Sequence, residues 1–143
     1  MKKVQFALIV SLIFIGARVS KAQAVMCPAT VNVRQEIQKP VAGWESFLAD
    51  SPVRLANVTF FDGPPKEKAS LVDTQRKKEA GHETATWQFT RTAGQHIWIA
   101  CSYSGTAVML TQQLSEKINS CTVTYNSRQL VAGMPMIESI VCK

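Results

Sequence analysis

The sequence predicts a mainly β domain, a single antiparallel sheet or sandwich with one short helix and two disulfides. Apolar and polar residues alternate along several short segments, which is the period of half-buried strands. Turn residues separate these segments at short intervals. The chain has four cysteines, and an even number is typical of disulfide pairing in a small domain that leaves the cytoplasm.

The first residues have the three parts of a secretory signal peptide. Residues 2–3 are lysines, residues 6–17 are apolar, and residues 22–24 (Ala-Gln-Ala) place small side chains where a signal peptidase cleaves. Arg18 ends the apolar stretch well short of the roughly 20 residues that a membrane span needs. We therefore predict cleavage after Ala24, with the rest of the chain in the periplasm rather than released from the cell.

Cleavage changes the charge of the chain. The full sequence has 16 Lys and Arg against 10 Asp and Glu, a net charge of +6. Four of these cations and none of the anions lie in residues 1–24, so residues 25–143 have 12 against 10, a net charge of +2. A nucleic-acid-binding domain is normally strongly basic. We expect residues 25–143 to form one domain that binds no nucleic acid and has no membrane span.

Strands account for most of the predicted secondary structure. The clearest pattern puts Ala85, Trp87 and Phe89 on one face of a strand and polar residues on the other. A second segment places Ile97 and Ile99 on one face, and Ser104-Gly105 follows it as a turn signal. The predicted strands are residues 30–37, 55–61, 83–90, 96–103, 106–111, 121–125 and 136–142.

Two segments depart from the strand pattern. Trp44, Phe47 and Leu48 have the i, i+3, i+4 spacing of a short helix, and Ser51-Pro52 ends it. Trp44 is expected on the apolar side of this helix. Residues 63–81 are polar and basic, and we predict a long exposed loop with a helical turn.

The cysteines predict a disulfide framework without fixing its connectivity. Cys121 and Cys142 stand at the outer ends of a predicted hairpin whose turn lies at residues 131–133. This register favours a Cys121–Cys142 bond and leaves Cys27 for Cys101, although a Cys101–Cys121 bond stays open. Loop-closure entropy gives about 3 kcal/mol for the shorter loop and about 4 to 5 kcal/mol for the longer. The same register pairs Val123 with Ile140 and Tyr125 with Glu138.

Catalytic and metal-binding patterns are absent from the sequence. The cysteines have no CxxC or CxxH spacing, and the histidines have no HxH or HExxH spacing. No Gly-rich phosphate loop or GxSxG elbow occurs. An enzyme would require His82 or His96 to meet Asp62, Glu83 or another acid. We expect no enzymatic activity, no cofactor and no metal.

The most distinctive local string is residues 60–65 (FFDGPP), which is typical of a rigid corner. A rigid corner beside a basic loop can present side chains to a partner at low entropic cost, and clustered charge raises association rates. The plain alternative is a structural turn and a solvated loop. The predicted partner-binding residues are Phe60, Phe61, Asp62, Lys66, Lys68, Arg76, Lys77, Lys78 and His82.

The tryptophans suggest a second possibility. Trp98 points away from Ile97 and Ile99 along its strand. An exposed Trp98 or Phe60 in a groove would favour a binding module for a glycan or a peptidoglycan fragment.

The chain resembles a family of small, exported and uncharacterised proteins of Gram-negative bacteria that is named by a locus tag. The resemblance covers most of residues 25–143 and rests on Cys27-Pro28, Gly43-Trp44, residues 57–65 (NVTFFDGPP), Ala85-Thr86-Trp87, Trp98, Cys101, Tyr103, Gly105-Thr106, Cys121 and residues 140–142. It implies no activity or cofactor. It does imply a protein partner, because such proteins occur near genes for antibacterial toxins. We expect this partner to be a cognate toxin or an envelope enzyme. The expected function is that of an immunity protein that occludes the active site of a cell-wall-targeting toxin.

Overall fold

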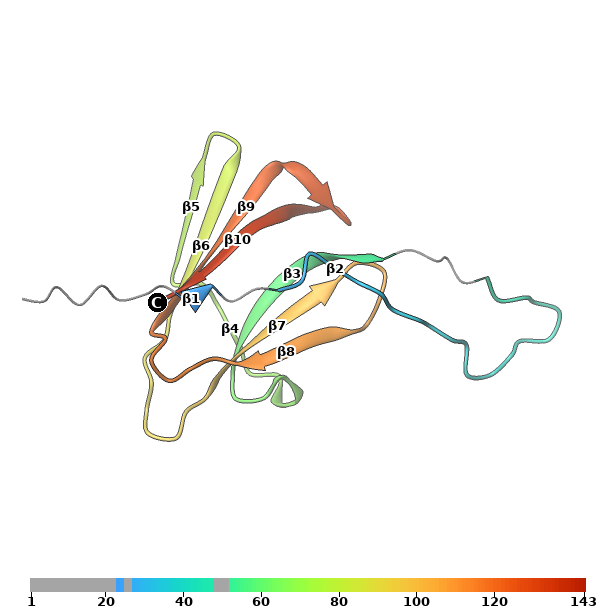
Figure 1. The fold of residues 1–143 in the computed structure, drawn as a ribbon, viewed down its shortest axis with the longest axis horizontal. Helices are drawn as coiled ribbons and strands as arrows, with labels where there is room; N and C mark the ends of the chain where they lie inside the picture. Colours follow the sequence, from blue (N-terminus) through green and yellow to red (C-terminus); the bar gives the residue numbers. More distant parts are fainter. Residues whose placement is uncertain (1–22, 25–26, 48–51) are drawn as a thin grey trace, which may run out of the picture.

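The computed structural model describes residues 23–24, 27–47 and 52–143. Two five-stranded antiparallel sheets make up this part of the chain (Figure 1). The mainly β fold is therefore confirmed. Most of the predicted signal peptide lies outside the described residues; Gln23 and Ala24 form a short strand that pairs with Cys142 and Val141.

Sheet A contains the C-terminal hairpin and the basic segment. Its strands run in the order β1-β10-β9-β6-β5. Their bounds are β1 Gln23–Ala24, β10 Met134–Cys142, β9 Ser120–Val131, β6 His82–Gln88 and β5 Gln75–Glu79.

Sheet B has the order β2-β3-β7-β8, with β4 also paired to β3. Their bounds are β2 Thr30–Val31, β3 Val53–Asp62, β7 Ile97–Tyr103, β8 Met109–Gln113 and β4 Ser70–Leu71. Between β2 and β3, residues 32–47 run away from both sheets (Figure 1), and we call this segment the arm.

The core lies between the two sheets. Phe60 from sheet B is fully buried, and its ring centroid lies 4.8 Å from that of Trp87 and 5.6 Å from that of Phe89. Ile97 and Ile99 are buried on the same sheet, as the alternating sequence predicted. Burial of each such side chain stabilises the fold by about 1.5–3 kcal/mol.

Both disulfides follow the favoured pairing. Cys121 and Cys142 are opposite each other in the β9–β10 hairpin, with a Cα–Cα distance of 4.1 Å. Cys27 is bonded to Cys101 of β7, with a Cα–Cα distance of 5.8 Å. This bond fixes the N-terminal segment to sheet B.

The predicted hairpin register is correct at one position and wrong at the other. Ile140 is opposite Val123, but Tyr125 is opposite Ile137 because a register shift lies between Ile137 and Ser139. A bulge puts an extra residue on one strand, and here that residue is Glu138. The turn is where the sequence placed it, with positive φ at Ala132 and Gly133.

Two other predictions need correction. Residues 44–47 are not helical, Trp44 is 80% exposed rather than packed, and Leu48 lies outside the described residues. The helical element of the described chain is instead the 3-10 turn η1 Pro65–Glu67. The predicted loop at residues 63–81 contains this turn, but it also contains β4 and β5.

Candidate functional site

The basic segment of the predicted binding surface forms an edge strand. All five residues of β5 are exposed, and the strand pairs only with β6. Arg76 is opposite Ala85 and Lys78 is opposite Glu83, so both basic side chains lie on the face that carries Glu83. Lys77 is opposite Thr84 and lies on the other face. The three adjacent basic residues therefore do not form one patch.

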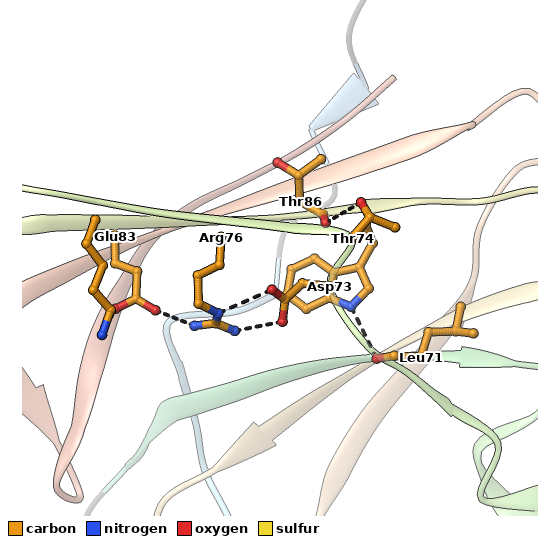
Figure 2. A network of polar contacts seen from close by, with 8 residues as sticks. Leu71, Asp73, Thr74, Arg76, Glu83 and Thr86 are labelled. Carbon is orange, nitrogen blue, oxygen red and sulfur yellow. Dashed lines mark hydrogen bonds and ion pairs between the residues drawn. The ribbon is translucent and has the colours of Figure 1, made fainter.

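Arg76 is held by two carboxylates (Figure 2). Its Nη2 lies 3.0 Å from Oδ1 of Asp73 and its Nε lies 3.3 Å from Oδ2, while Nη1 donates to Glu83. These hydrogen bonds lower the pKa of both carboxyl groups and raise that of the guanidinium. The Arg76 charge is thus largely neutralised.

Glu83 explains why this cluster forms. It is only 8% exposed, and a carboxylate in that position needs cationic partners. Arg76 supplies one, and Nζ of Lys78 lies 3.5 Å from the second carboxylate oxygen. The neighbouring Tyr125 is partly buried, and desolvation raises the pKa of its hydroxyl. We infer that Arg76 and Lys78 stabilise the edge of sheet A.

The three residues of the corner at 60–62 differ in how far their side chains are available at the surface. Phe60 lies in the core with no exposed surface, so it is not available to a partner. Phe61 is partly exposed and lies opposite Trp98 on the outer face of sheet B. Asp62 accepts a hydrogen bond of 2.7 Å from Nε2 of Gln95.

Lys66 and Lys68 lie in and just after η1, and both are exposed. Lys68 has a φ of 59°, in the left-handed region, and its N–H donates to the carbonyl of Pro65. None of the ion pairs formed by the described residues involves Lys66, Lys68 or Lys77. These three lysines are the free positive charges of the predicted surface.

The two histidines lie at the starts of different strands. His82 begins β6, and its Nδ1 is 3.1 Å from Glu138, the bulge residue of β10. His96 precedes β7, and its Nδ1 is 3.8 Å from Glu116 and 3.1 Å from the side-chain amide of Gln113. Both imidazoles are exposed. Each contact is an ordinary surface pair, which contributes at most about 1 kcal/mol.

A groove of about 540 Å³ opens between β10 and the beginning of sheet B. Its lining is mainly apolar, and Arg54 and Glu138 are its charged residues. Neither Trp98 nor Phe60 lines it, within the part of the chain that the structure describes. The aromatic platform expected of a glycan binder is therefore not in this groove. The lining residues are Cys27, Ala29, Thr30, Arg54, Leu55, Val131, Met136, Ile137, Glu138, Ser139, Ile140 and Val141.

Sequence reasoning missed a second exposed region. The arm carries four exposed apolar side chains, and residues 108–110, where β8 begins, carry three more. For β8 the available signal was the absence of any charge from residue 106 to residue 114 (TAVMLTQQL). These side chains are Ile37, Val41, Trp44, Phe47, Val108, Met109 and Leu110.

Comparisons with known proteins give two matches. An uncharacterised 16.3 kDa protein encoded in the trpG 5′ region of Azospirillum brasilense is 25% identical over 122 residues, which covers 80% of this chain and 81% of that protein. No solved structure matches the chain. The family described as "Type VI secretion system Tli immunity protein" matches residues 50–143, which contain both sheets from β3 to β10. The chain therefore belongs to the Tli family of type VI secretion system immunity proteins.

Proposed function

We propose that this chain is a periplasmic immunity protein, which binds a cell-wall-targeting toxin of a type VI secretion system and occludes its active site. The observation that carries the proposal is the family match over residues 50–143. An immunity protein acts by binding, so the chain would be a stoichiometric inhibitor rather than an enzyme.

The two disulfides support a periplasmic site of action. Cys27–Cys101 and Cys121–Cys142 use all four cysteines, and such bonds persist in oxidising compartments such as the bacterial periplasm. A toxin neutralised there would attack a substrate that is reached from the periplasm, and the cell wall is such a substrate.

The free lysines of the predicted surface fit a steering role. Lys66, Lys68 and Lys77 are exposed and make no ion pair in the described residues. Positive charge of this kind raises the rate of encounter with an acidic partner more than it raises affinity. We propose that they guide the toxin toward the chain.

Co-expression tests the immunity function. Cells that export the cognate toxin to the periplasm should survive when they also make residues 1–143. The matched control makes Met1 followed by residues 25–143, which stays in the cytoplasm and should not protect. Death of cells that make the full chain would overturn the immunity function. Equal protection by the control would overturn the periplasmic location alone.

A titration tests the mechanism and the substrate. Purified residues 25–143 should abolish the release of fragments from isolated cell wall by the toxin, with an end point at one molecule of chain per toxin. Complete inhibition at a small fraction of that ratio would indicate catalytic inactivation and contradict a binding inhibitor. A toxin that leaves cell wall intact but degrades membrane lipid would contradict the cell-wall target.

A further inference from the structure

The open edge of sheet B is formed by β8, which pairs only with β7. In an antiparallel pair, alternate residues direct their main-chain groups toward the partner strand. The N–H of Leu114 donates to the carbonyl of Ile97, and Gln113 lies opposite Trp98. By this alternation the N–H and C=O groups of Met109, Thr111 and Gln113 point away from β7. A complementary strand could therefore pair with them.

The other described edges are protected against such pairing. Sheet A ends at β5, whose sequence Gln-Arg-Lys-Lys-Glu is charged, and at β1, which has two residues. Sheet B has the two-residue strands β2 and β4 beside β3. Charge and shortness are the usual means of blocking edge association. Among the described strands, β8 combines five exposed residues with no charge and no proline.

The arm passes close to one end of this edge. Nε2 of Gln35 donates a 3.0 Å hydrogen bond to the carbonyl of Gly105, in the turn between β7 and β8. The Cys27–Cys101 bond fixes the chain just before the arm to β7, and Cys101 is opposite Leu110 of β8. The arm leaves β2, which pairs with β3 on the other side of sheet B, and the Gln35 contact brings it to the turn where β8 begins.

Most exposed apolar surface of the described chain belongs to these two segments. Of the eleven large apolar side chains that are exposed, seven lie on the arm or at residues 108–110. Phe47 is 91% exposed. The arm carries two basic and two acidic residues, of which Arg34 and Glu36 form an ion pair at 2.7 Å. The combined surface is apolar and close to neutral.

We propose that β8 and the arm together form the docking surface for the toxin, which adds an uncharged edge strand to β8 and receives the arm in an apolar cleft. This inference rests on the proposed function, because the family requires a protein partner. Strand addition supplies main-chain hydrogen bonds, and side chains at alternate positions supply specificity.

The size of a stable interface explains why both parts are needed. A strand of five residues is about 17 Å long, and strand pairing over that length falls short of the roughly 800 Å² that each partner buries in a stable complex. The arm adds Trp44 and Phe47, and aromatic residues are the usual centres of binding energy. A projecting arm also reaches the partner away from β8, which suits a protein that occludes an active site.

Thr111→Pro tests the strand addition. Proline removes the outward N–H at position 111 without removing a hydrogen bond to β7, and proline is tolerated on an edge strand of this kind. The probe is the purified cognate toxin, with binding measured by isothermal titration calorimetry. We expect Thr111→Pro to weaken binding about 30-fold. Thr111→Val keeps the N–H and should bind the toxin at least about 10-fold more tightly than Thr111→Pro.

Trp44→Ala combined with Phe47→Ala tests the arm. We expect this double variant to bind about 100-fold more weakly. The matched control is Val72→Ala, which removes an exposed apolar side chain between β4 and β5 and should leave binding unchanged. Thermal melts of all variants establish that they are folded. If Thr111→Pro melts much lower than the wild type, Met109→Lys replaces it as a charged block of the same edge.

The outcomes separate this inference from the proposed function. Failure of the wild type to bind the toxin would overturn both. Tight binding by the wild type and by both kinds of variant would overturn the docking surface and leave the immunity function intact. A third outcome is that the wild type dimerises in sedimentation experiments, and that Thr111→Pro abolishes the dimer without any effect on toxin binding. This result would show that the β8 edge binds a second copy of the chain, and it would overturn the inference.

Discussion

The two long edge strands of the sandwich have the same size and opposite chemistry. β5 and β8 each contain five residues, all exposed. β5 is charged along its whole length apart from Gln75, and Arg76 and Lys78 contact the buried Glu83. β8 has no charge and begins with Met109 and Leu110. One sheet therefore ends in an edge that repels a further strand, and the other ends in an edge that can accept one.

The two edge strands therefore differ in what they contribute. β5 contributes to the stability of the fold, whereas β8 offers a surface for binding. Two charges of β5, those of Arg76 and Lys78, contact a buried carboxylate and so contribute to the fold. The exposed residues of β8 and the arm contribute little to the core, so they are free to serve recognition. A disulfide cross-links each sheet: Cys121–Cys142 lies within sheet A, and Cys27–Cys101 fixes the segment before β2 to sheet B.

Removal of a disulfide should lower the stability more than any other change proposed below. The loss should be larger for Cys27–Cys101, which is attached to the sheet that contains β8. The Cys27–Cys101 bond closes a loop with a sequence separation of 74, against 21 for Cys121–Cys142. We expect Cys27→Ala with Cys101→Ala to lower the free energy of unfolding by about 4.5 kcal/mol, and Cys121→Ala with Cys142→Ala by about 3.3 kcal/mol. Urea denaturation followed by tryptophan fluorescence measures both. A smaller loss for the longer loop would contradict this order.

Arg76→Gln should lower the free energy of unfolding by about 1–2 kcal/mol, because it removes the main partner of the buried Glu83. The pKa values of Asp73 and Glu83 are lowered in the folded state from ordinary values of 3.8 and 4.5. Their contribution is therefore present above about pH 4.5 and is lost as the pH falls through the lowered values. Wild-type stability should decrease from pH 5 to pH 2 more steeply than that of the variant, as urea denaturation at each pH would measure. Parallel pH profiles would count against an ion-pair role for Arg76.

Removal of charge from the β5 edge should promote self-association of the chain, with the smallest change in stability of the three predictions. Lys77→Val with Lys78→Thr removes two of the four charges of β5 and leaves Arg76 and Glu79. We expect a change in the free energy of unfolding of no more than about 0.5 kcal/mol, together with self-association in sedimentation velocity. The control is Lys66→Val with Lys68→Asn, which removes the same charge outside the described strands, suits the left-handed backbone at residue 68 and should stay monomeric. Equal association of both variants would attribute the effect to net charge.

The sequence predicts the strands whose two faces differ. Residues 83–90 and 96–103 have one face in the core, so their apolar residues alternate with polar ones and the pattern is visible. β5 has no buried face, and its residues therefore carry no period that distinguishes a strand from a loop. The pairing of Cys121 with Cys142 followed from the hairpin, whereas the bulge at Glu138 depends on local backbone geometry that alternation does not encode.

The arm and the edge show why the site was harder to predict than the fold. The spacing of Trp44 and Phe47 fits a helix, but a short helix needs tertiary packing and these side chains are exposed. Residues 106–111 were expected to form a strand, and β8 is that strand, displaced to Met109–Gln113. Its position at an edge depends on the order of strands in the sheet, which local sequence does not determine. Phe60 was expected at a binding surface for a similar reason and is instead part of the core.

Amide hydrogen–deuterium exchange, with and without the cognate toxin, tests the contrast between the two edges most directly. In the free chain the amides of Met109, Thr111 and Gln113 should exchange rapidly, because they have no partner strand. In the complex these three amides should become protected, together with the arm, while the exchange of β5 remains unchanged. Protection of β5 in the complex, with β8 exchanging as fast as in the free chain, would contradict the account.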